Sequence, residues 1–393
     1  MLTVPSYQNR CGARRLLAIV VQGERIRFND MKTRPARAEL VEARARREST
    51  VPGGRGAVFG VSGWRLAVLT PLHTRMISVR LTWGEPGLLH ADGRIFDLRK
   101  RGIVPLAGKL KGPGVVHDMA VSIDLDLPEL RIRRIEPVMY AFPFAPSPAT
   151  RGEGCPDRLP DVQRLLGVSL RQGYGPAVTD RVGGPLGCFH IFTLLRLIGP
   201  TIESVVRREG SAARAAVPGS PLFARSVVMD GLKGEGLSIV LRGTLFDLYY
   251  RPGADALPPE EELEASVEAA ADVQVEVPGI TITAAQGRVR RGGPGVERIG
   301  AWDAVPLVGD LVGRQMLKGY TAQVQEVFAE HTDVEPLQHL LFMLAPTLMQ
   351  CFPSLAEELE LRPRRAEGTH GAVDSCHMWR ADGPLIHIAP MPG

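Results

Sequence analysis

Three short patterns in the sequence bring together side chains that bind metals or act as nucleophiles. Cys155 lies in a Pro- and Gly-rich loop, Gly187-Cys-Phe-His190 stands where a helix is expected to begin, and Ser375-Cys-His377 lies near the C-terminus. Thiolate and imidazole are preferred ligands of zinc and iron. A helix N-terminus also favours a thiolate, because its free N–H groups and its dipole stabilise the anion. The patterns therefore predict either a metal site or an activated thiol.

A fourth pattern, His117-Asp118, lies on a predicted strand. Our leading hypothesis is a first half that binds a transition metal, zinc or iron, or an iron–sulfur species through Cys155, Cys188 and His190, with Asp118 or Cys376 completing the set. Four such ligands match a closed tetrahedral site. If this is so, the ligand atoms of Cys155, Cys188 and His190 converge.

Two other interpretations stay open. A thiol-dependent enzyme would use Cys188 as the nucleophile and His190 or His377 as its base, because a Cys–His pair is the smallest device that activates a thiol. Alternatively, the cysteines and histidines are packing residues of a structural or interaction protein, since cysteine is often simply buried.

The elements that would position these residues occur twice. Pro71-Leu-His-Thr-Arg75 returns as Pro221-Leu-Phe-Ala-Arg225, and at the same shift of 150 residues Gly93-Arg-Ile-Phe-Asp-Leu98 returns as Gly243-Thr-Leu-Phe-Asp-Leu248. Farther on the shift is 146, and residues 171–201 lie over residues 317–347 with seven identities in 31 positions. The sequence therefore predicts an internal duplication.

The second half acts as an internal control for the candidate ligands. At the equivalent positions Cys188 becomes Val334, His190 becomes Pro336, and the pair His117-Asp118 becomes Val267-Glu268. The apolar framework stays while nearly every candidate ligand is lost. We therefore expect a task confined to the first copy.

Within each copy, strands precede helices. Residues 75–81, 94–99, 115–127 and 130–140 alternate apolar and polar side chains, as half-buried strands do. After the loop at 143–160 the period lengthens, and residues 187–208 form a mostly apolar helix. Strands within 225–292 and helices around 303–358 follow in the second half. This order predicts an α+β protein of two similar halves, each an antiparallel sheet followed by packed helices.

We divide the chain into an N-terminal extension (1–66), a first unit with the candidate site (67–207), a second, degenerate unit (208–365) and a C-terminal tail (366–393). Residues 1–75 hold 14 Lys+Arg and 5 Asp+Glu, whereas the net charge of the whole chain is +4, so the rest is mildly acidic. No basic face with interleaved aromatics follows, which argues against nucleic-acid binding. No nucleotide-binding loop occurs either.

The chain has no run of eighteen apolar residues and no secretory cleavage pattern. Its five cysteines are odd in number and widely spaced, in a chain too large to need disulfide staples. We therefore expect no membrane span, reduced thiols and a cytoplasmic location.

In the order of its motifs the sequence resembles the bacterial domain-of-unknown-function 2889 family. The resemblance covers about 71–206 and 368–390 and implies no particular reaction. It rests on Leu72-His-Thr-Arg75, His117-Asp-Met119, a Cys in the central loop, Leu165-Leu-Gly-Val-x-Leu with Gly173-Tyr174, Gly187-Cys-x-His190 and Asp374-Ser-Cys-His377.

A fainter resemblance is to iron–sulfur cluster assembly scaffolds. In those proteins a strand-borne Asp, loop cysteines and a helix-start His-Cys hold zinc or a cluster, and here the stretch from Val115 to Ile123 is followed by Cys155 and by Cys188 with His190. The Gly-Cys-Gly loop of the scaffolds is missing, so we treat this as an analogy of fold.

Overall fold

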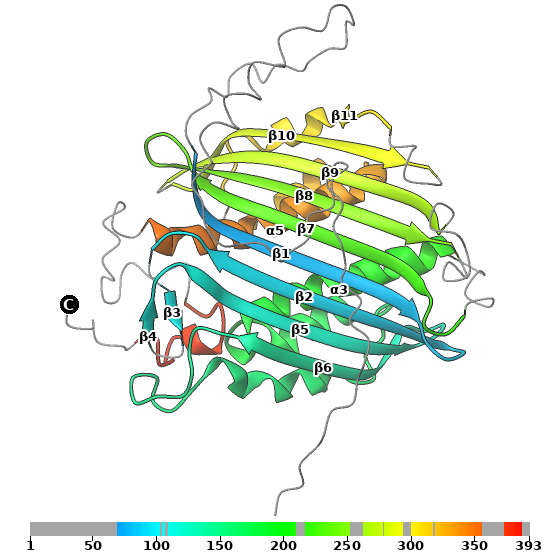
Figure 1. Ribbon diagram of the computed structural model, residues 1–393, viewed down its shortest axis with the longest axis horizontal. Coiled ribbons are helices and arrows are strands. Elements are labelled where there is room, and N and C mark those ends of the chain that lie inside the picture. Colours follow the sequence, from blue (N-terminus) through cyan, green and yellow to red (C-terminus); the bar gives the residue numbers. More distant parts are fainter. Residues whose placement is uncertain are drawn as a thin grey trace, which may run out of the picture. The chain divides into compact units, whose positions relative to one another are not determined.

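The main element of the protein is one nine-stranded antiparallel sheet (Figure 1). The computed structural model describes residues 69–102, 104–106, 109–209, 217–251, 262–277, 279–293, 300–316, 319–355 and 373–386. The strand order is β11-β10-β9-β8-β7-β1-β2-β5-β6. The α+β prediction is confirmed, and the sheets of the two halves are continuous because β1 pairs with β7. The N-terminal extension predicted over 1–66 lies outside the described residues.

The same order of four long strands occurs in each half. In the first half these are β1 (Thr70–Trp83), β2 (Leu88–Arg99), β5 (Gly114–Asp126) and β6 (Arg131–Ala141), and in the second β7 (Pro221–Lys233), β8 (Ser238–Tyr250), β9 (Leu263–Glu276) and β10 (Thr281–Gly292). The short β3 (Val104–Leu106) and β4 (Lys109–Lys111) form a separate hairpin, and β11 (Asp303–Ala304) ends the large sheet.

Each set of strands is followed by two α-helices. These are α2 (Tyr174–Val182) and α3 (Phe189–Glu209) in the first half, and α4 (Tyr320–Val327) and α5 (Glu335–Cys351) in the second. Short 3-10 turns connect them: η1 (Cys155–Arg158), η2 (Pro160–Leu165), η3 (Gly184–Leu186), η6 (Pro306–Leu311), η7 (Thr332–Val334), η8 (Phe352–Ser354) and η9 (His377–Trp379). The described helices lie on one face of the sheet (Figure 1).

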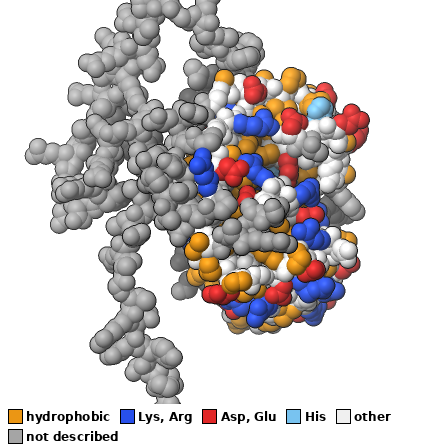
Figure 2. All heavy atoms as spheres, turned by 90° about the vertical axis from the view of Figure 1, so that its right-hand side faces the viewer, with side chains coloured by type: hydrophobic (Ala, Val, Ile, Leu, Met, Phe, Trp, Pro, Cys, Tyr) orange, Lys and Arg blue, Asp and Glu red, His pale blue; other side chains and the backbone are white. Residues whose placement is uncertain are grey.

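The alternation of side chains along the strands decides which face the helices cover. On β1, Ile77 and Val79 are buried beneath the helices while Ser78 and Arg80 are exposed on the other face. That is the pattern of an antiparallel sheet with one packed and one polar face. Figure 2 shows acidic and basic side chains interspersed with apolar ones, without a large area of one sign on the face it draws.

Helix α3 is long and apolar enough to cross a membrane by length and composition alone. In the structure 67% of its most apolar window is buried. Its buried side chains, among them Leu194, Leu195 and Ile198, belong to the core beneath the sheet. In the described structure α3 is therefore a helix of the buried core.

Two equivalent glycines allow α3 and α5 to approach the sheet closely. A Cβ on Gly93 of β2 would lie 2.4 Å from Cδ1 of Ile198, and one on Gly243 of β8 would lie 2.8 Å from Cδ1 of Leu340. Both distances are too short for two non-bonded carbon atoms. The close approach of each helix to the sheet therefore requires glycine at these positions. This explains why a glycine stands at the corresponding place in each half of the sheet.

We predict that Gly93→Val lowers the free energy of unfolding by about 1–3 kcal/mol, because extra methyl groups in a packed core force neighbours to shift. The matched control is Gly114→Val on β5, where an added Cβ meets nothing within 4 Å. Urea unfolding of both variants checks this. Equal losses in the two variants would contradict the close helix seat.

Candidate functional site

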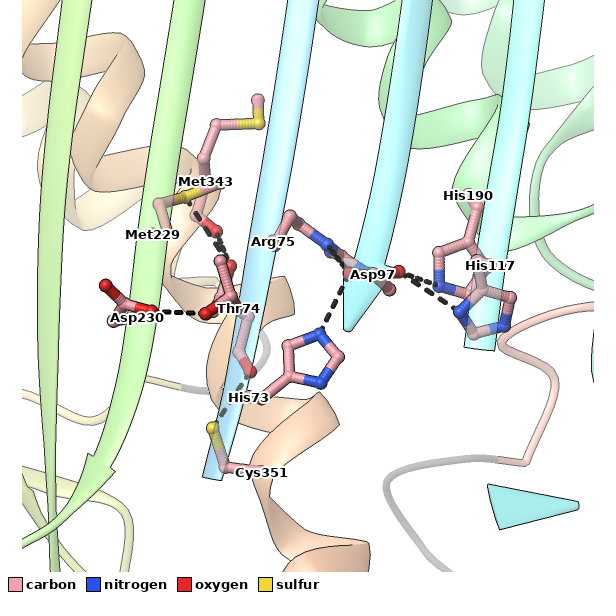
Figure 3. A network of polar contacts seen from close by, with 11 residues as sticks. His73, Thr74, Arg75, Asp97, His117, His190, Met229, Asp230, Met343 and Cys351 are labelled. Atoms are coloured by element: carbon pink, nitrogen blue, oxygen red, sulfur yellow. Dashed lines mark hydrogen bonds and ion pairs between the residues drawn. The ribbon is translucent and has the colours of Figure 1, made fainter. Parts of the chain in front are cut away.

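An arginine, an aspartate and a histidine meet on three neighbouring strands. Arg75 on β1 lies opposite Asp97 on β2, and Asp97 lies opposite His117 on β5. Paired residues of adjacent strands project to the same face, here the face that the helices cover. Nε of Arg75 donates to Oδ1 of Asp97 at 2.8 Å and Nη2 donates to Oδ2 at 2.9 Å (Figure 3). Both side chains are fully buried.

This pair fixes the charge at the centre of the first unit. Burial by itself would raise the pKa of Asp97, but the Arg75 guanidinium and the hydrogen bonds with His117 and His73 hold that pKa well below its ordinary value. Asp97 is therefore a carboxylate in the folded protein. The bidentate geometry is the strongest form of such a pair.

Three histidines surround the carboxylate. Nε2 of His73 lies 2.9 Å from Oδ1 of Asp97, Nδ1 of His117 lies 3.1 Å from Oδ2, and Nε2 of His190 lies 3.3 Å from Oδ2. The rings of His117 and His190 stack with centroids 3.6 Å apart. Burial lowers the pKa of all three histidines below the ordinary value. The imidazoles are therefore neutral, the form that binds metals.

The contact between Nε2 of His190 and Oδ2 of Asp97 is short enough for an ion pair but is not aligned as a hydrogen bond. The Nε2 atom of His190 is buried and has no hydrogen-bond partner among the described residues. Buried polar atoms are nearly always hydrogen-bonded, so an exception calls for an explanation.

Asp97, His117 and His190 form a group that could hold a metal ion. One ligand atom from each lies within 4.8 Å of the other two. Ligand atoms that surround one tetrahedral ion at about 2.0–2.2 Å are about 3.3–3.6 Å apart. The contacts of 3.1 and 3.3 Å to Oδ2 of Asp97 are close to that spacing.

The second unit keeps the ion pair and loses the histidines. Arg225 binds Asp247 through the same atoms, Nε to Oδ1 and Nη2 to Oδ2, both at 2.7 Å. Where the first unit has His73, His117 and His190, the second has Phe223, Val267 and Pro336. The Arg–Asp pair is therefore common to both units, and the histidines belong to the first alone.

The two arginines also differ in their remaining nitrogen. Nη1 of Arg225 donates to Oγ1 of Thr201 at 3.0 Å and to Nδ1 of His339 at 2.8 Å. Nη1 of Arg75 is buried and has no hydrogen-bond partner among the described residues. Every guanidinium nitrogen of Arg225 thus has a hydrogen-bond partner, whereas Nη1 of Arg75 has none among the described residues.

The structure places the C-terminal tail (residues 373–386) on the first unit, beside the two segments that carry Cys155 and Cys188. The backbone N–H of His377 donates to the carbonyl of Gly187 at 2.9 Å, and Nε2 of His377 lies 2.9 Å from the carbonyl of Gly154. Each of these residues adjoins a cysteine, namely Cys376, Cys188 and Cys155.

The other two predicted site residues lie elsewhere. Asp118 follows His117 on β5 and projects to the polar face of the sheet, where Nε and Nη2 of Arg94 bind its carboxylate at 2.7 and 2.6 Å. His190 faces Asp97, as described above. The predicted residues therefore divide between the thiols, the buried histidine group and the opposite face.

Sequence reasoning missed Asp97 and His73 as site residues. The signal was present, because Arg75 and Asp97 return unchanged as Arg225 and Asp247 in the two sequence patches that match at a shift of 150 residues. A charge that persists through otherwise apolar strand patches indicates a buried pair.

We predict that Asp97→Ala lowers the free energy of unfolding by about 3–5 kcal/mol, because it leaves the Arg75 guanidinium buried and unpaired. The control is Asp118→Ala, whose partner Arg94 is 55% exposed; it should cost at most about 1 kcal/mol. Chemical denaturation of both variants measures the difference. A mild loss from Asp97→Ala would show that the buried pair is not needed.

A second prediction concerns pH and His339 on α5. Burial and the neighbouring Arg225 lower the pKa of His339 to about 3, and its Nδ1 accepts a hydrogen bond only when it is deprotonated. Below the unfolded pKa of about 6.5 the unfolded chain binds a proton that the folded chain does not, so stability falls with falling pH. His339→Asn keeps an acceptor without this titration.

Between pH 7 and pH 5 the wild type should lose about 2 kcal/mol of unfolding free energy through this histidine. His339→Asn should be less sensitive by that amount in urea titrations at the two pH values. Identical pH dependence of the two proteins would contradict the assignment of Nδ1 as an acceptor.

Comparison with known families found a match to one segment of the chain. Residues 73–203 match the family model described as protein of unknown function (DUF2889). The matched segment contains Asp97, His117, His190, Cys155 and Cys188, while the tail lies outside it. Searches of curated proteins and of solved structures found no match to the chain. The resemblance seen in the motifs is thus confirmed over residues 73–203, the segment that matches this family model.

Proposed function

We propose that the first unit binds a divalent transition-metal ion through Asp97, His117 and His190. The observation that carries this proposal is the convergence of the three ligand atoms around a buried carboxylate. The buried Nε2 of His190, which lacks a hydrogen-bond partner among the described residues, supports it because an ion would satisfy that atom.

The donor set favours a transition metal over magnesium or calcium. Imidazole nitrogen suits zinc, iron, copper and nickel, whereas magnesium and calcium prefer oxygen ligands throughout. Arg75 already balances the charge of Asp97, so an ion at this place depends on bonds to neutral imidazoles more than on charge neutralisation. We therefore expect zinc or ferrous iron.

The contrast between the two units supports a function beyond packing. If the ion pair served packing alone, we would expect Nη1 of Arg75 to have hydrogen-bond acceptors, as Nη1 of Arg225 has in Thr201 and His339. In the first unit Nη1 of Arg75, Nδ1 of His73 and Nε2 of His190 are all buried without hydrogen-bond partners among the described residues. A bound ion that carries a further ligand would give these buried atoms partners. A purely structural role leaves them without any.

A thiol-dependent enzyme with Cys188 as nucleophile has less support. Burial raises the pKa of the Cys188 thiol to about 12, whereas an activated thiol needs a lowered one. Its sulfur contacts Sδ of Met119 at 3.8 Å, and His190 faces Asp97.

The described cysteines are all free thiols, which fits the cytoplasmic location expected from the sequence.

The test is metal analysis of the full chain, purified anaerobically without a chelating tag and then equilibrated with zinc or ferrous iron. We predict that His117→Val, which introduces the residue of the second unit, and His190→Ala each remove one equivalent of bound ion. The control is His331→Ala, an exposed histidine of the second unit, which should leave the metal content unchanged.

Circular dichroism establishes that the variants are folded. If His117→Val and His190→Ala are folded and bind as much metal as the wild type, the proposed site is wrong.

A further inference from the structure

We propose a second site, the cavity between α3 and α5, which binds a carboxylate with an apolar body, such as a medium-chain alkanoate. The cavity has a volume of about 920 Å³, which is within the range of sites that hold small molecules. Residues of α2 and α4 complete its wall. None of the proposed metal ligands lines the cavity, so this proposal does not depend on the metal site.

The cavity lies between equivalent positions of the two repeats. Helices α3 and α5 both lie on the covered face of the sheet (Figure 1), and residues 189–201 of the one correspond to residues 335–347 of the other. Equivalent residues line the cavity from both sides, among them the pairs Thr193 and His339, Leu197 and Met343, and Pro200 and Pro346. The same face of each helix therefore forms one wall of the cavity.

Aromatic rings supply much of the apolar lining. These are Phe189 and Phe192 of α3, Phe342 of α5, and Phe328, which directly follows α4. A cavity of this kind binds the apolar part of a molecule by removing it from water. The lining therefore favours a ligand with an apolar body.

Among the described side chains that line the cavity, the charged ones are engaged with one exception. Nη2 of Arg207 lies 3.3 Å from Oε1 of Glu203, and Oε2 of Glu335 accepts a hydrogen bond from Oγ of Ser204 at 3.0 Å. Arg196 forms no hydrogen bond or ion pair with another described residue. The cavity therefore offers a positive charge that the described acidic groups leave uncompensated.

The position of this charge indicates how a ligand would lie. Arg196 is exposed, whereas Thr193 and Leu197 on the same helix and Met343 on α5 are buried. The guanidinium is therefore at the opening of the cavity, and the apolar lining lies deeper. An alkanoate fits this order, because its chain enters the apolar part while its carboxylate meets the guanidinium, which can bind both oxygens.

Tyr320 adds an unused donor to the wall. Its side chain is buried, and its hydroxyl has no hydrogen-bond partner among the described residues. The equivalent Tyr174 donates to the carbonyl of Leu195 at 2.8 Å. A Cβ on Gly199 would lie 2.1 Å from Cε1 of Tyr174, and the second repeat has Ala345 at this place. The methyl group of Ala345 therefore prevents Tyr320 from packing on α5 in the same way.

The experiment is calorimetric titration of the full chain with octanoate, with octan-1-ol as the uncharged probe of the same length. We expect one octanoate per chain, bound more tightly than octanol. Arg196→Gln should weaken octanoate binding about 5–10-fold, because a charge-assisted hydrogen bond is lost, and leave octanol binding unchanged. The control is Arg181→Gln, an exposed arginine of α2 that does not line the cavity; it should bind octanoate as the wild type does.

Nuclear magnetic resonance of isotopically labelled methionine methyl groups provides a second readout that locates the ligand. Octanoate should shift the signal of Met343, which lines the cavity. The signal of Met76 should stay in place, because this side chain is exposed on the polar face of the sheet. Met343→Leu identifies the signal that shifts.

Octanoate that does not bind, that binds the wild type and Arg196→Gln equally, or that shifts Met76 instead of Met343 would overturn the proposal. Octanol that binds the wild type as tightly as octanoate would also overturn it, because the cavity would then be a site for uncharged apolar molecules.

Discussion

The buried ion pair between Arg75 and Asp97 is the constraint on which the site depends. Two charges without access to water are tolerated only when each is paired in good geometry, and here both guanidinium–carboxylate bonds are formed within the sheet. The pair fixes the carboxylate at the centre of three strands. The histidines on the neighbouring strands and at the start of α3 all face this one carboxylate.

The second unit shows what the pair does without the histidines. Arg225 and Asp247 keep the same geometry, and side chains of α3 and α5 complete the hydrogen bonding of Arg225. Thr201 belongs to the first unit's helix, so the ion pair of one half is completed by the other. The two units are therefore joined by this hydrogen bond as well as by the pairing of β1 with β7 in one continuous sheet.

Much of the fold could be predicted from the sequence, because alternation along the strands and the mostly apolar helix at 187–208 follow directly from burial. The pairing of β1 with β7 could not, since an edge formed between two repeats has no local sequence signal. Asp97 was missed because a charged residue on an alternating strand normally faces water; only its recurrence as Asp247 shows that it lies inside. Cys188 and His190 looked like co-ligands because they are close in sequence. Two residues apart on a helix start, however, side chains point in different directions, and His190 turned to Asp97 instead.

We infer that histidines added to a shared Arg–Asp framework make the first unit a metal site. The most direct test is a crystal structure of the full chain grown with zinc, with an anomalous difference map at the zinc absorption edge. We predict a peak about 2.0–2.2 Å from Asp97, His117 and His190, with none beside Asp247. A map without density at Asp97, or with equal density at both aspartates, would contradict the account.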